Sequence, residues 1–221
     1  MKKISFLLLV IAALAYLIYA PSPIQPIAWQ APPPPTPTGI YSPNTLLQNI
    51  TPYPLPKGGK GPESIAFDKK GVGATADSDG QLYKLIADAQ QNYSLIPWIK
   101  LAGRPLGMQF APPKQHGQDL IVADAIAGLL SISPQGEVQV LSHSYAGKPY
   151  GFVDDVAVAS NGKIYFSDAT HRAWMNEDPS LAMHASQFEV LEHGGNGRLF
   201  VYDPTNQSVE LLLEGLQFAN G

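Results

Sequence analysis

The sequence predicts an all-β repeat domain that follows an N-terminal transmembrane helix and a proline-rich linker. Three observations lead to this prediction: an uncharged apolar run over residues 4–20, a concentration of prolines over residues 21–56, and strand-like segments that recur over residues 57–221. The chain has 221 residues, which allows one domain or at most two. Its 20 glycines and 21 prolines favour a turn-rich β protein over a helical bundle.

The composition excludes several classes of function. The net charge is −4, so there is no basic excess to neutralise phosphates, and we expect no nucleic-acid partner. Cysteine is absent. This excludes a disulfide scaffold, a thiolate zinc site and a cysteine nucleophile.

Residues 1–20 are predicted to be a signal anchor or a signal peptide. Two lysines, Lys2 and Lys3, precede a run without charge from Ile4 to Ala20. As a helix this run rises about 25 Å, the lower end of what spans a bilayer, and the lysines place the N-terminus in the cytoplasm. Pro21 would hinder cleavage after Ala20, which favours the uncleaved anchor over a cleaved signal and secretion. In both cases we expect the domain in the periplasm or another extracytoplasmic space.

Residues 21–56 are predicted to be an extended spacer. They hold twelve of the 21 prolines, four of them consecutive over residues 32–35, and no charged residue lies between Lys3 and Lys57. Consecutive prolines favour polyproline II, which is semi-rigid. Trp29 and Tyr41 have two possible positions, at the lipid headgroups or packed on the domain.

Residues 57–221 read as a degenerate repeat of short strands separated by Gly, Asp and Pro turns. Aligning Phe67, Phe110 and Val158 gives spacings of 43 and 48 residues. Periods of 40 to 50 residues with about four strands are typical of β-propeller blades. The sequence therefore predicts three blades and, over residues 217–221, the start of a fourth, with helices only in the N-terminal segment and in short insertions.

The repeat alignment predicts a metal site. Glu63 and Asp154 lie four residues before Phe67 and Val158, and Asn220 falls at the matching position of the fourth repeat. Equivalent positions in successive blades occupy equivalent places around the axis, so these three side chains should meet at one end of the central channel. Three oxygen ligands without sulfur suit Ca²⁺, which would also relieve the repulsion between two carboxylates. The alternative is that they cap turns and strands.

Other polar residues recur or stand near this position. Asp77, Asp124 and Asp168 end equivalent strands, and we expect them to accept hydrogen bonds from the turns that follow. Arg104, at the start of the second repeat, is expected to form a salt bridge, or else to bind a carboxylate substrate.

The histidines give weaker predictions. His171 follows a strand near the expected mouth of the channel and is the one catalytic candidate, because it could polarise a substrate carbonyl. His184 and His193 lie in the insertion over residues 171–196 and belong either to a lid or to a plain surface loop.

Several motifs, taken in order, resemble the gluconolactonase, senescence-marker-protein and strictosidine-synthase-like group of β-propellers. The anchor and linker are similar to the membrane-anchored branch of that group, and the resemblance covers about residues 55–221. The motifs are Gly61-Pro62-Glu63-Ser64, Gly103-Arg104-Pro105-Leu106-Gly107, Val153-Asp154-Asp155-Val156-Ala157-Val158, Ile164-Tyr165-Phe166-Ser167-Asp168, Gly197-Arg198-Leu199-Phe200-Val201-Tyr202-Asp203-Pro204 and Gly215-Leu216-Gln217-Phe218-Ala219-Asn220-Gly221.

The resemblance implies a six-bladed propeller that binds a divalent cation, usually calcium, and hydrolyses small-molecule lactones or aryl esters. Glu63 matches the family's first-blade metal ligand and Asn220 the Asn of its Asn-Gly motif, whereas Asp154 stands where hydrolytic members often carry Asn. The family's catalytic acid belongs to a later blade and is expected beyond Gly221, so we expect this chain to be a fragment of a longer protein. Two alternatives stay open: a strictosidine-synthase-like condensing enzyme and a non-catalytic binding module.

Overall fold

The computed structural model describes residues 2–20, 24, 26–90, 92–113, 118–172 and 184–221. Helix α1 spans Lys2–Tyr19. Its large apolar side chains lie on the surface, as shown by the exposed fractions of 70% for Phe6 and 75% for Leu17.

The predicted transmembrane helix is not found. Among the helices that the structure describes, none combines the length and the apolar character that crossing a membrane requires.

The linker leads from α1 to the sheets with little regular structure. Its described residues form two short 3₁₀ helices, η1 (Gly39–Tyr41) and η2 (Pro56–Gly58). Of the two positions open to Trp29, the structure shows the one on the domain, because its ring lies 5.1 Å from the ring of His193. Close by, the Ile27 N–H donates a hydrogen bond to the carbonyl of Leu191.

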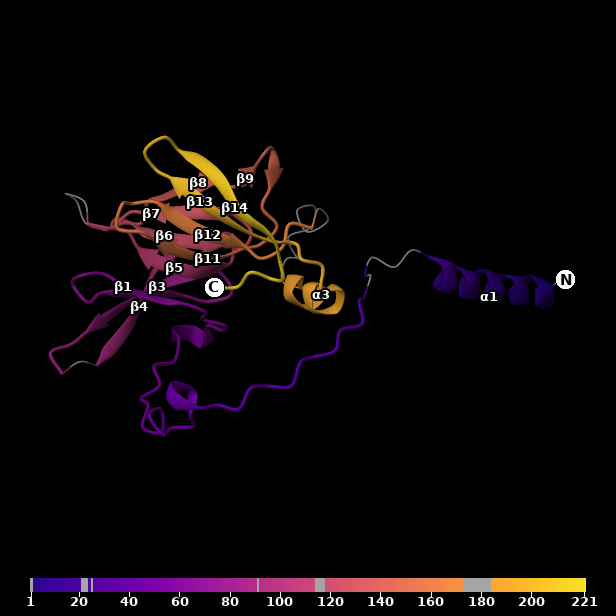
Figure 1. Ribbon diagram of the computed structural model, residues 1–221, viewed down its shortest axis with the longest axis horizontal. Helices are drawn as coiled ribbons and strands as arrows, with labels where there is room; N and C mark the ends of the chain where they lie inside the picture. The colour runs from indigo at the N-terminus through magenta and orange to yellow at the C-terminus, as the bar shows by residue number, and fades with distance from the viewer. Residues whose placement is uncertain (1, 21–23, 25, 91, 114–117, 173–183) are drawn as a thin grey trace.

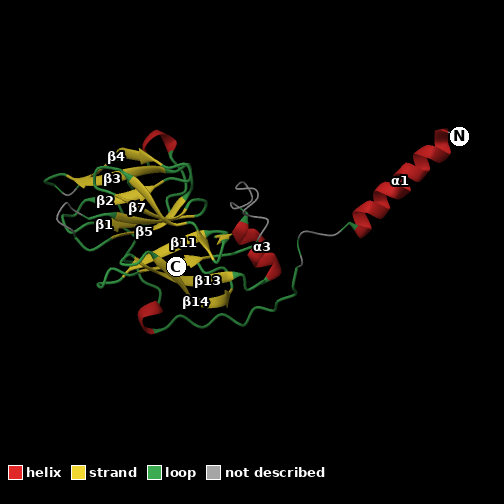
Figure 2. Cartoon of the chain, turned by 90° about the horizontal axis from the view of Figure 1, so that it is seen from above, coloured by secondary structure: helices red, strands yellow, loops and turns green. Residues whose placement is uncertain are grey.

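Three four-stranded antiparallel sheets make up the domain, and each is a meander in which consecutive strands pair (Figures 1 and 2). The first contains β1 (Ile65–Phe67), β2 (Gly73–Ala76), β3 (Gln81–Ala87) and β4 (Tyr93–Lys100). The second contains β5 (Pro105–Phe110), β6 (Leu120–Asp124), β7 (Gly128–Ile132) and β8 (Val138–Ser142). The third contains β11 (Val153–Val158), β12 (Ile164–Asp168), β13 (Gly197–Asp203) and β14 (Ser208–Leu216).

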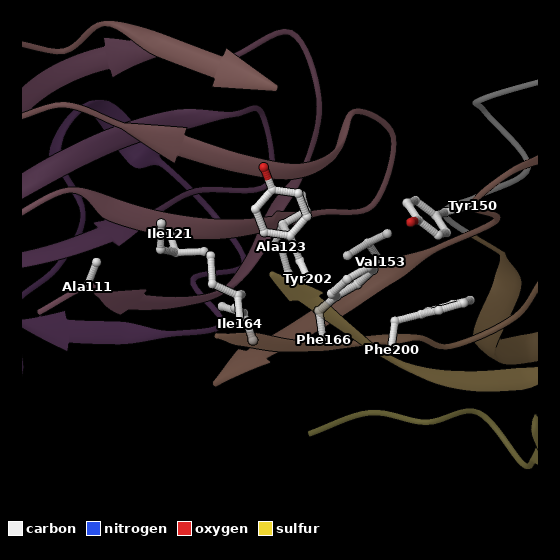
Figure 3. Packing of buried hydrophobic residues seen from close by; sticks show 11 residues of the cluster. Ala111, Ile121, Ala123, Tyr150, Val153, Ile164, Phe166, Phe200 and Tyr202 are labelled. Carbon is white, nitrogen blue, oxygen red and sulfur yellow. The ribbon is translucent and has the colours of Figure 1, made fainter. Parts of the chain in front are cut away.

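The sheets stack face to face through two apolar cores. Side chains of the first two sheets, such as Leu82 and Val122, pack in one core. The other joins the second and third sheets and includes Ile121, Phe166 and Phe200, with Phe166 and Phe200 stacked at 5.3 Å between ring centroids (Figure 3). Successive side chains of a strand point to opposite faces, so in β6 of the second sheet Leu120 and Val122 pack in the core shared with the first sheet, and Ile121 and Ala123 in the core shared with the third.

The prediction of four-stranded antiparallel blades is confirmed for three repeats, and two details need comment. Residues 217–221 form no strand, contrary to the expected opening of a fourth blade, because the described chain offers them no partner strand. The insertion carries a short helix, α3 (Ala185–Glu192), in agreement with helices confined to insertions; its residues 173–183 lie outside the described part. A two-residue-per-strand hairpin, β9 (Ser144–Tyr145) and β10 (Lys148–Pro149), precedes β11.

Candidate functional site

The structure brings the three predicted metal-site residues together. Glu63, Asp154 and Asn220 line one pocket of about 170 Å³, and Arg104 lines it with them. Glu63 lies two residues before β1, Asp154 is the second residue of β11, and Asn220 follows β14. The first strands of the three sheets lie side by side, β1 against β5 and β5 against β11, so equivalent residues near their N-terminal ends meet.

Apolar side chains form the rest of the pocket wall. Leu106, Phe152 and Phe218 line it, and the rings of Phe152 and Phe218 lie 5.8 Å apart. Together they pack with Ala169 and with Ala185 of α3 in a small apolar cluster. The pocket lining therefore combines charged side chains with an aromatic part, formed by Phe152 and Phe218, that we call the aromatic rim.

Arg104 forms the salt bridge expected of it. Its Nη2 lies 3.2 Å from Glu63 Oε2, and the exposed fractions of the two side chains are 15% and 41%. The guanidinium compensates the charge of Glu63, on the exposed side of the pocket.

Asp154 has no such partner. It is 3% exposed, and its Oδ2 is buried without a hydrogen bond. The pKa of Asp154 is raised to about 7, chiefly by burial and then by the charges of Glu63 and Asp155, while Arg104 acts in the opposite direction. We call Glu63 and Asp154 the axial acids.

A second recurring set of acids, Asp77, Asp124 and Asp168, is held by hydrogen bonds, and we call these the turn aspartates. Asp77 Oδ1 accepts the N–H groups of Asp79 and Gln81 at 3.0 and 2.9 Å, and its Oδ2 accepts the Tyr83 hydroxyl at 2.9 Å. The prediction of turn hydrogen bonding is confirmed for this residue.

In the other two turn aspartates, Asp124 and Asp168, the Oδ1 atom accepts backbone N–H groups in both residues, whereas the surroundings of the Oδ2 atom differ. Asp124 Oδ1 accepts three backbone N–H groups, including that of Arg104 at 3.2 Å, while its Oδ2 is buried without a partner. Asp168 Oδ1 accepts the N–H groups of Gly151 and Phe152, and its Oδ2 accepts Arg198 Nε at 3.1 Å. Burial raises the pKa of Asp168, and these donors oppose the shift.

The histidines lie away from the pocket wall. His171 is exposed, and its Nδ1 lies 2.5 Å from the Asn196 carbonyl oxygen. His184 contacts Gln187, and His193 contacts Trp29. None of them lines the pocket described above, so the structure does not place His171 beside the axial acids.

The aromatic rim was missed in the sequence, although a signal for it existed. Phe152 and Phe218 lie two residues before Asp154 and Asn220, and Arg104 lies two residues before Leu106. The repeat position two residues upstream of the predicted ligand therefore also faces the pocket. Ser186 of α3, which completes the wall, carried no such signal because it lies in the insertion.

The donor set of the pocket is mixed. Within the part of the chain that the structure describes, no group of three or more His, Cys, Asp or Glu side chains is placed to hold a metal ion. The three oxygen-bearing side chains here are a glutamate, an aspartate and an asparagine, and the amide supplies a neutral carbonyl oxygen of the kind that Ca²⁺ accepts.

Comparison with known proteins identifies the family. The family model "Strictosidine synthase" matches residues 154–221, and "Strictosidine synthase-like, N-terminal" matches residues 39–85. The adipocyte plasma membrane-associated protein of Danio rerio is 32% identical over 237 residues, which cover 100% of this chain and 52% of that protein. Strictosidine synthase-like 7 of Arabidopsis thaliana is 35% identical over 163 residues, 72% of this chain and 41% of that protein.

A solved structure supports the same fold. The gluconolactonase XC5397 of Xanthomonas campestris superposes with a TM-score of 0.53 at 15% identity, over 71% of this chain and 48% of that one. The likeness shows a propeller-like fold, and the chain spans about half the length of the curated relatives it matches. The family predicted from the sequence is thus confirmed: the chain belongs to the strictosidine synthase-like family, which shares its fold with gluconolactonase.

Proposed function

We propose that the pocket around the axial acids binds a divalent cation of the calcium type and that the protein hydrolyses lactones or aryl esters. The observation that carries this proposal is the meeting of Glu63, Asp154 and Asn220, from three separate repeats, in one pocket with a buried, unpartnered carboxylate oxygen of Asp154. A buried carboxylate without a hydrogen-bond partner is costly, and a cation would compensate it.

The residues present fit such an ion. Glu63, Asp154 and Asn220 would hold it through oxygen atoms, which Ca²⁺ prefers, and six to eight ligands in total leave places for water and substrate. When bound, a divalent cation polarises a carbonyl group and lowers the pKa of a water molecule. The salt bridge between Arg104 and Glu63 would then weaken, because the cation and the guanidinium group of Arg104 would share the same carboxylate.

The chain's own side chains supply the rest of the expected chemistry. Phe152, Phe218 and Leu106 exclude water from one side of the pocket and offer an apolar surface to the substrate. In the chain without a cation the pKa of Asp154 is about 7, so a cation that binds its carboxylate at neutral pH would displace a proton from it. Hydrolysis adds water across the ester bond and gives an acid and an alcohol, which in a lactone remain one molecule.

Calcium titration of the full chain tests the proposal. We expect Glu63→Gln to weaken binding roughly tenfold, or about 1.4 kcal/mol, because one negative charge is lost with little change of shape. Asp154→Asn should have a milder effect, because hydrolytic members of the group that the sequence resembles often carry Asn at this position. Isothermal calorimetry measures both, and lactone and phenyl ester hydrolysis is followed with and without a chelator.

The matched control is Glu210→Gln, an exposed position outside the pocket, which should leave calcium affinity unchanged. Equal affinity in the wild-type chain and Glu63→Gln would show that the axial acids have only a structural role. Calcium binding without hydrolysis of any ester would support the non-catalytic binding module instead.

A second candidate is condensation of an amine with an aldehyde, as the strictosidine synthase match suggests. Residues 154–221, which that family model matches, include Asp154 and Asn220 of the pocket. A protonated Asp154 beside an aromatic rim could assist loss of water from the carbinolamine. Consumption of amine and aldehyde that persists in excess chelator would favour this reaction over hydrolysis.

We also propose that the protein is membrane-associated, with its domain on the extracytoplasmic side. The support is the name of the Danio rerio relative, adipocyte plasma membrane-associated protein, and the apolar run that follows Lys2 and Lys3. Protease protection of the domain in sealed vesicles tests the placement, and accessibility from the cytoplasmic side would contradict it.

A further inference from the structure

Helix α3 has its polar and apolar sides reversed. The side that packs against the domain includes Glu189 and Glu192, which are 4% and 5% exposed, together with Ala185. The exposed side carries Val190 and Leu191, with exposed fractions of 67% and 48%. A surface helix ordinarily buries its aliphatic side chains and exposes its acids, so the reversed pattern points to a second contact on the exposed side.

Polar contacts fix this orientation. Glu189 Oε1 accepts hydrogen bonds from Thr170 Oγ1 at 2.6 Å and from Asn196 Nδ2 at 2.7 Å. Glu192 forms a salt bridge with Arg172. These partners come from both ends of the insertion and hold the acids inward, so α3 cannot rotate to bury Val190 without leaving two carboxylates unpaired.

The linker extends the exposed apolar side. Ile27 donates its N–H to the Leu191 carbonyl, and the Trp29 ring packs on His193 just after α3. Ile27 and Trp29 are themselves 57% and 60% exposed. We call the surface formed by Ile27, Trp29, Val190 and Leu191 the α3 patch. None of these four side chains is charged. The neighbouring His193 would carry a positive charge only when it is protonated.

The position of the patch along the chain indicates what covers it. Ala20 follows α1, and seven Cα–Cα steps separate it from Ile27, which reach at most about 25 Å. The contacts of Ile27 and Trp29 with Leu191 and His193 bring this part of the linker to α3. The α3 patch is therefore connected by only a few residues to α1, a helix whose large side chains are apolar and exposed.

We propose that the α3 patch rests on the surface of a lipid bilayer, at the level of the headgroups. A tryptophan beside aliphatic side chains is the composition that favours this region, and the absence of charge between Lys3 and Lys57 removes a penalty for entering it. Ser186, one helical turn before Val190, lines the pocket of the axial acids. The bilayer contact would thus hold the rim of that pocket close to the lipid.

The absence of cysteine makes the test direct, because a single introduced thiol can be labelled. The full chain carrying Val190→Cys, labelled with a nitrobenzoxadiazole dye, is mixed with phosphatidylcholine vesicles. We expect the dye emission to shift to shorter wavelength and to rise roughly twofold or more, with quenching by nitroxide-labelled lipid and protection from iodide.

The matched control is Val138→Cys, a valine that is also exposed, 48% against 67% for Val190, at the start of β8 and outside the patch and the pocket. Its dye should stay accessible to iodide in the same vesicles. A second labelled variant, Val190→Cys with Leu191→Asp, should lose most of the lipid quenching while its circular dichroism spectrum stays unchanged.

Two results would overturn the proposal. One is equal iodide quenching at positions 190 and 138 in the presence of vesicles. The other is protection of position 190 without lipid, at rising protein concentration, which would show a second copy of the chain on the patch. The bilayer contact rests on the membrane association proposed above, whereas neither result depends on calcium or on hydrolysis, so the proposed hydrolase activity is tested separately.

Discussion

The axial acids and the turn aspartates are carboxylates of the same repeat, yet their surroundings differ. Each turn aspartate accepts at least two backbone N–H groups, as Asp168 does from Gly151 and Phe152. Asp154 is also buried, and its Oδ2 has no hydrogen-bond partner. Asp124 Oδ2 shares that feature, but Asp124 Oδ1 accepts three backbone N–H groups, and Asp154 has no such donors among the described residues. Repetition alone therefore does not identify a site in a propeller-like fold, whereas a recurring buried acid that is not held by backbone donors is a candidate.

The largest expected effect comes from breaking the best-held turn aspartate. Asp168→Ala removes the acceptor of two backbone N–H groups and leaves Arg198 buried without its ion-pair partner. We expect a loss of about 3 to 5 kcal/mol in the free energy of unfolding, measured by urea denaturation.

The double variant Asp168→Ala with Arg198→Met should recover part of that loss, because the unpaired charge is then removed as well. Asp203→Ala, which breaks the partly exposed pair with Lys163, serves as the comparison and should cost much less. If Asp168→Ala cost no more than Asp203→Ala, the turn aspartates would not be the structural members of the repeat.

An effect of opposite sign is expected at Asp154. Its pKa is raised from 3.8 to about 7 on folding, so its contribution to stability is fully present below pH 3.8 and is lost as the pH rises through about 7. Asp154→Asn cannot ionise and should be more stable than the wild-type chain above pH 8, by on the order of 2 kcal/mol, and no more stable at pH 4.

Urea denaturation at several pH values, in the presence of a chelator, measures this difference. Asp79→Asn, at an exposed turn position, should show no gain at high pH. A loss of stability in Asp154→Asn at pH 8 would mean that the ionised carboxylate is compensated in the folded chain, and the contrast between the two sets of acids would fail.

The smallest effect is expected at the other axial acid. Glu63 is 41% exposed and paired with Arg104, and surface pairs of this kind contribute little. Arg104→Gln and Glu63→Gln should each change the free energy of unfolding by about 0.5 kcal/mol or less. A loss of several kcal/mol in either variant would show that this pair, and not Asp154, is the charge on which the pocket depends.

Much of the fold could be predicted because its periodicity is local. Alternating apolar residues and turn residues such as Asp68 and Asn161 define each strand from nearby sequence alone, and the spacing of Phe67, Phe110 and Val158 defines the blades. The predicted strand over residues 217–221 was wrong, because a strand needs a partner strand that the sequence pattern of these residues cannot supply.

The sequence by itself determined that three oxygen-bearing side chains would meet in the pocket. Glu63, Asp154 and Asn220 occupy equivalent repeat positions, and a repeated meander carries equivalent positions to one end of the stack whatever the side chains are. It likewise determined that Asp77, Asp124 and Asp168 would share one role.

Only the tertiary structure decided how those residues are compensated. Glu63 and Arg104 are 41 residues apart, and their pairing leaves Asp154 as the acid without a donor. The reversed orientation of α3 could not be predicted from the sequence either. It depends on the hydrogen bonds of Glu189 with Thr170 and Asn196, which form only in the folded chain. The contact of Trp29 with His193 likewise joins residues that are far apart in the sequence. The periodicity of the sequence determines on which face of its own strand a side chain lies. Its hydrogen-bond or ion-pair partner depends on how separate segments pack together, and the periodicity of each segment carries no information about that packing.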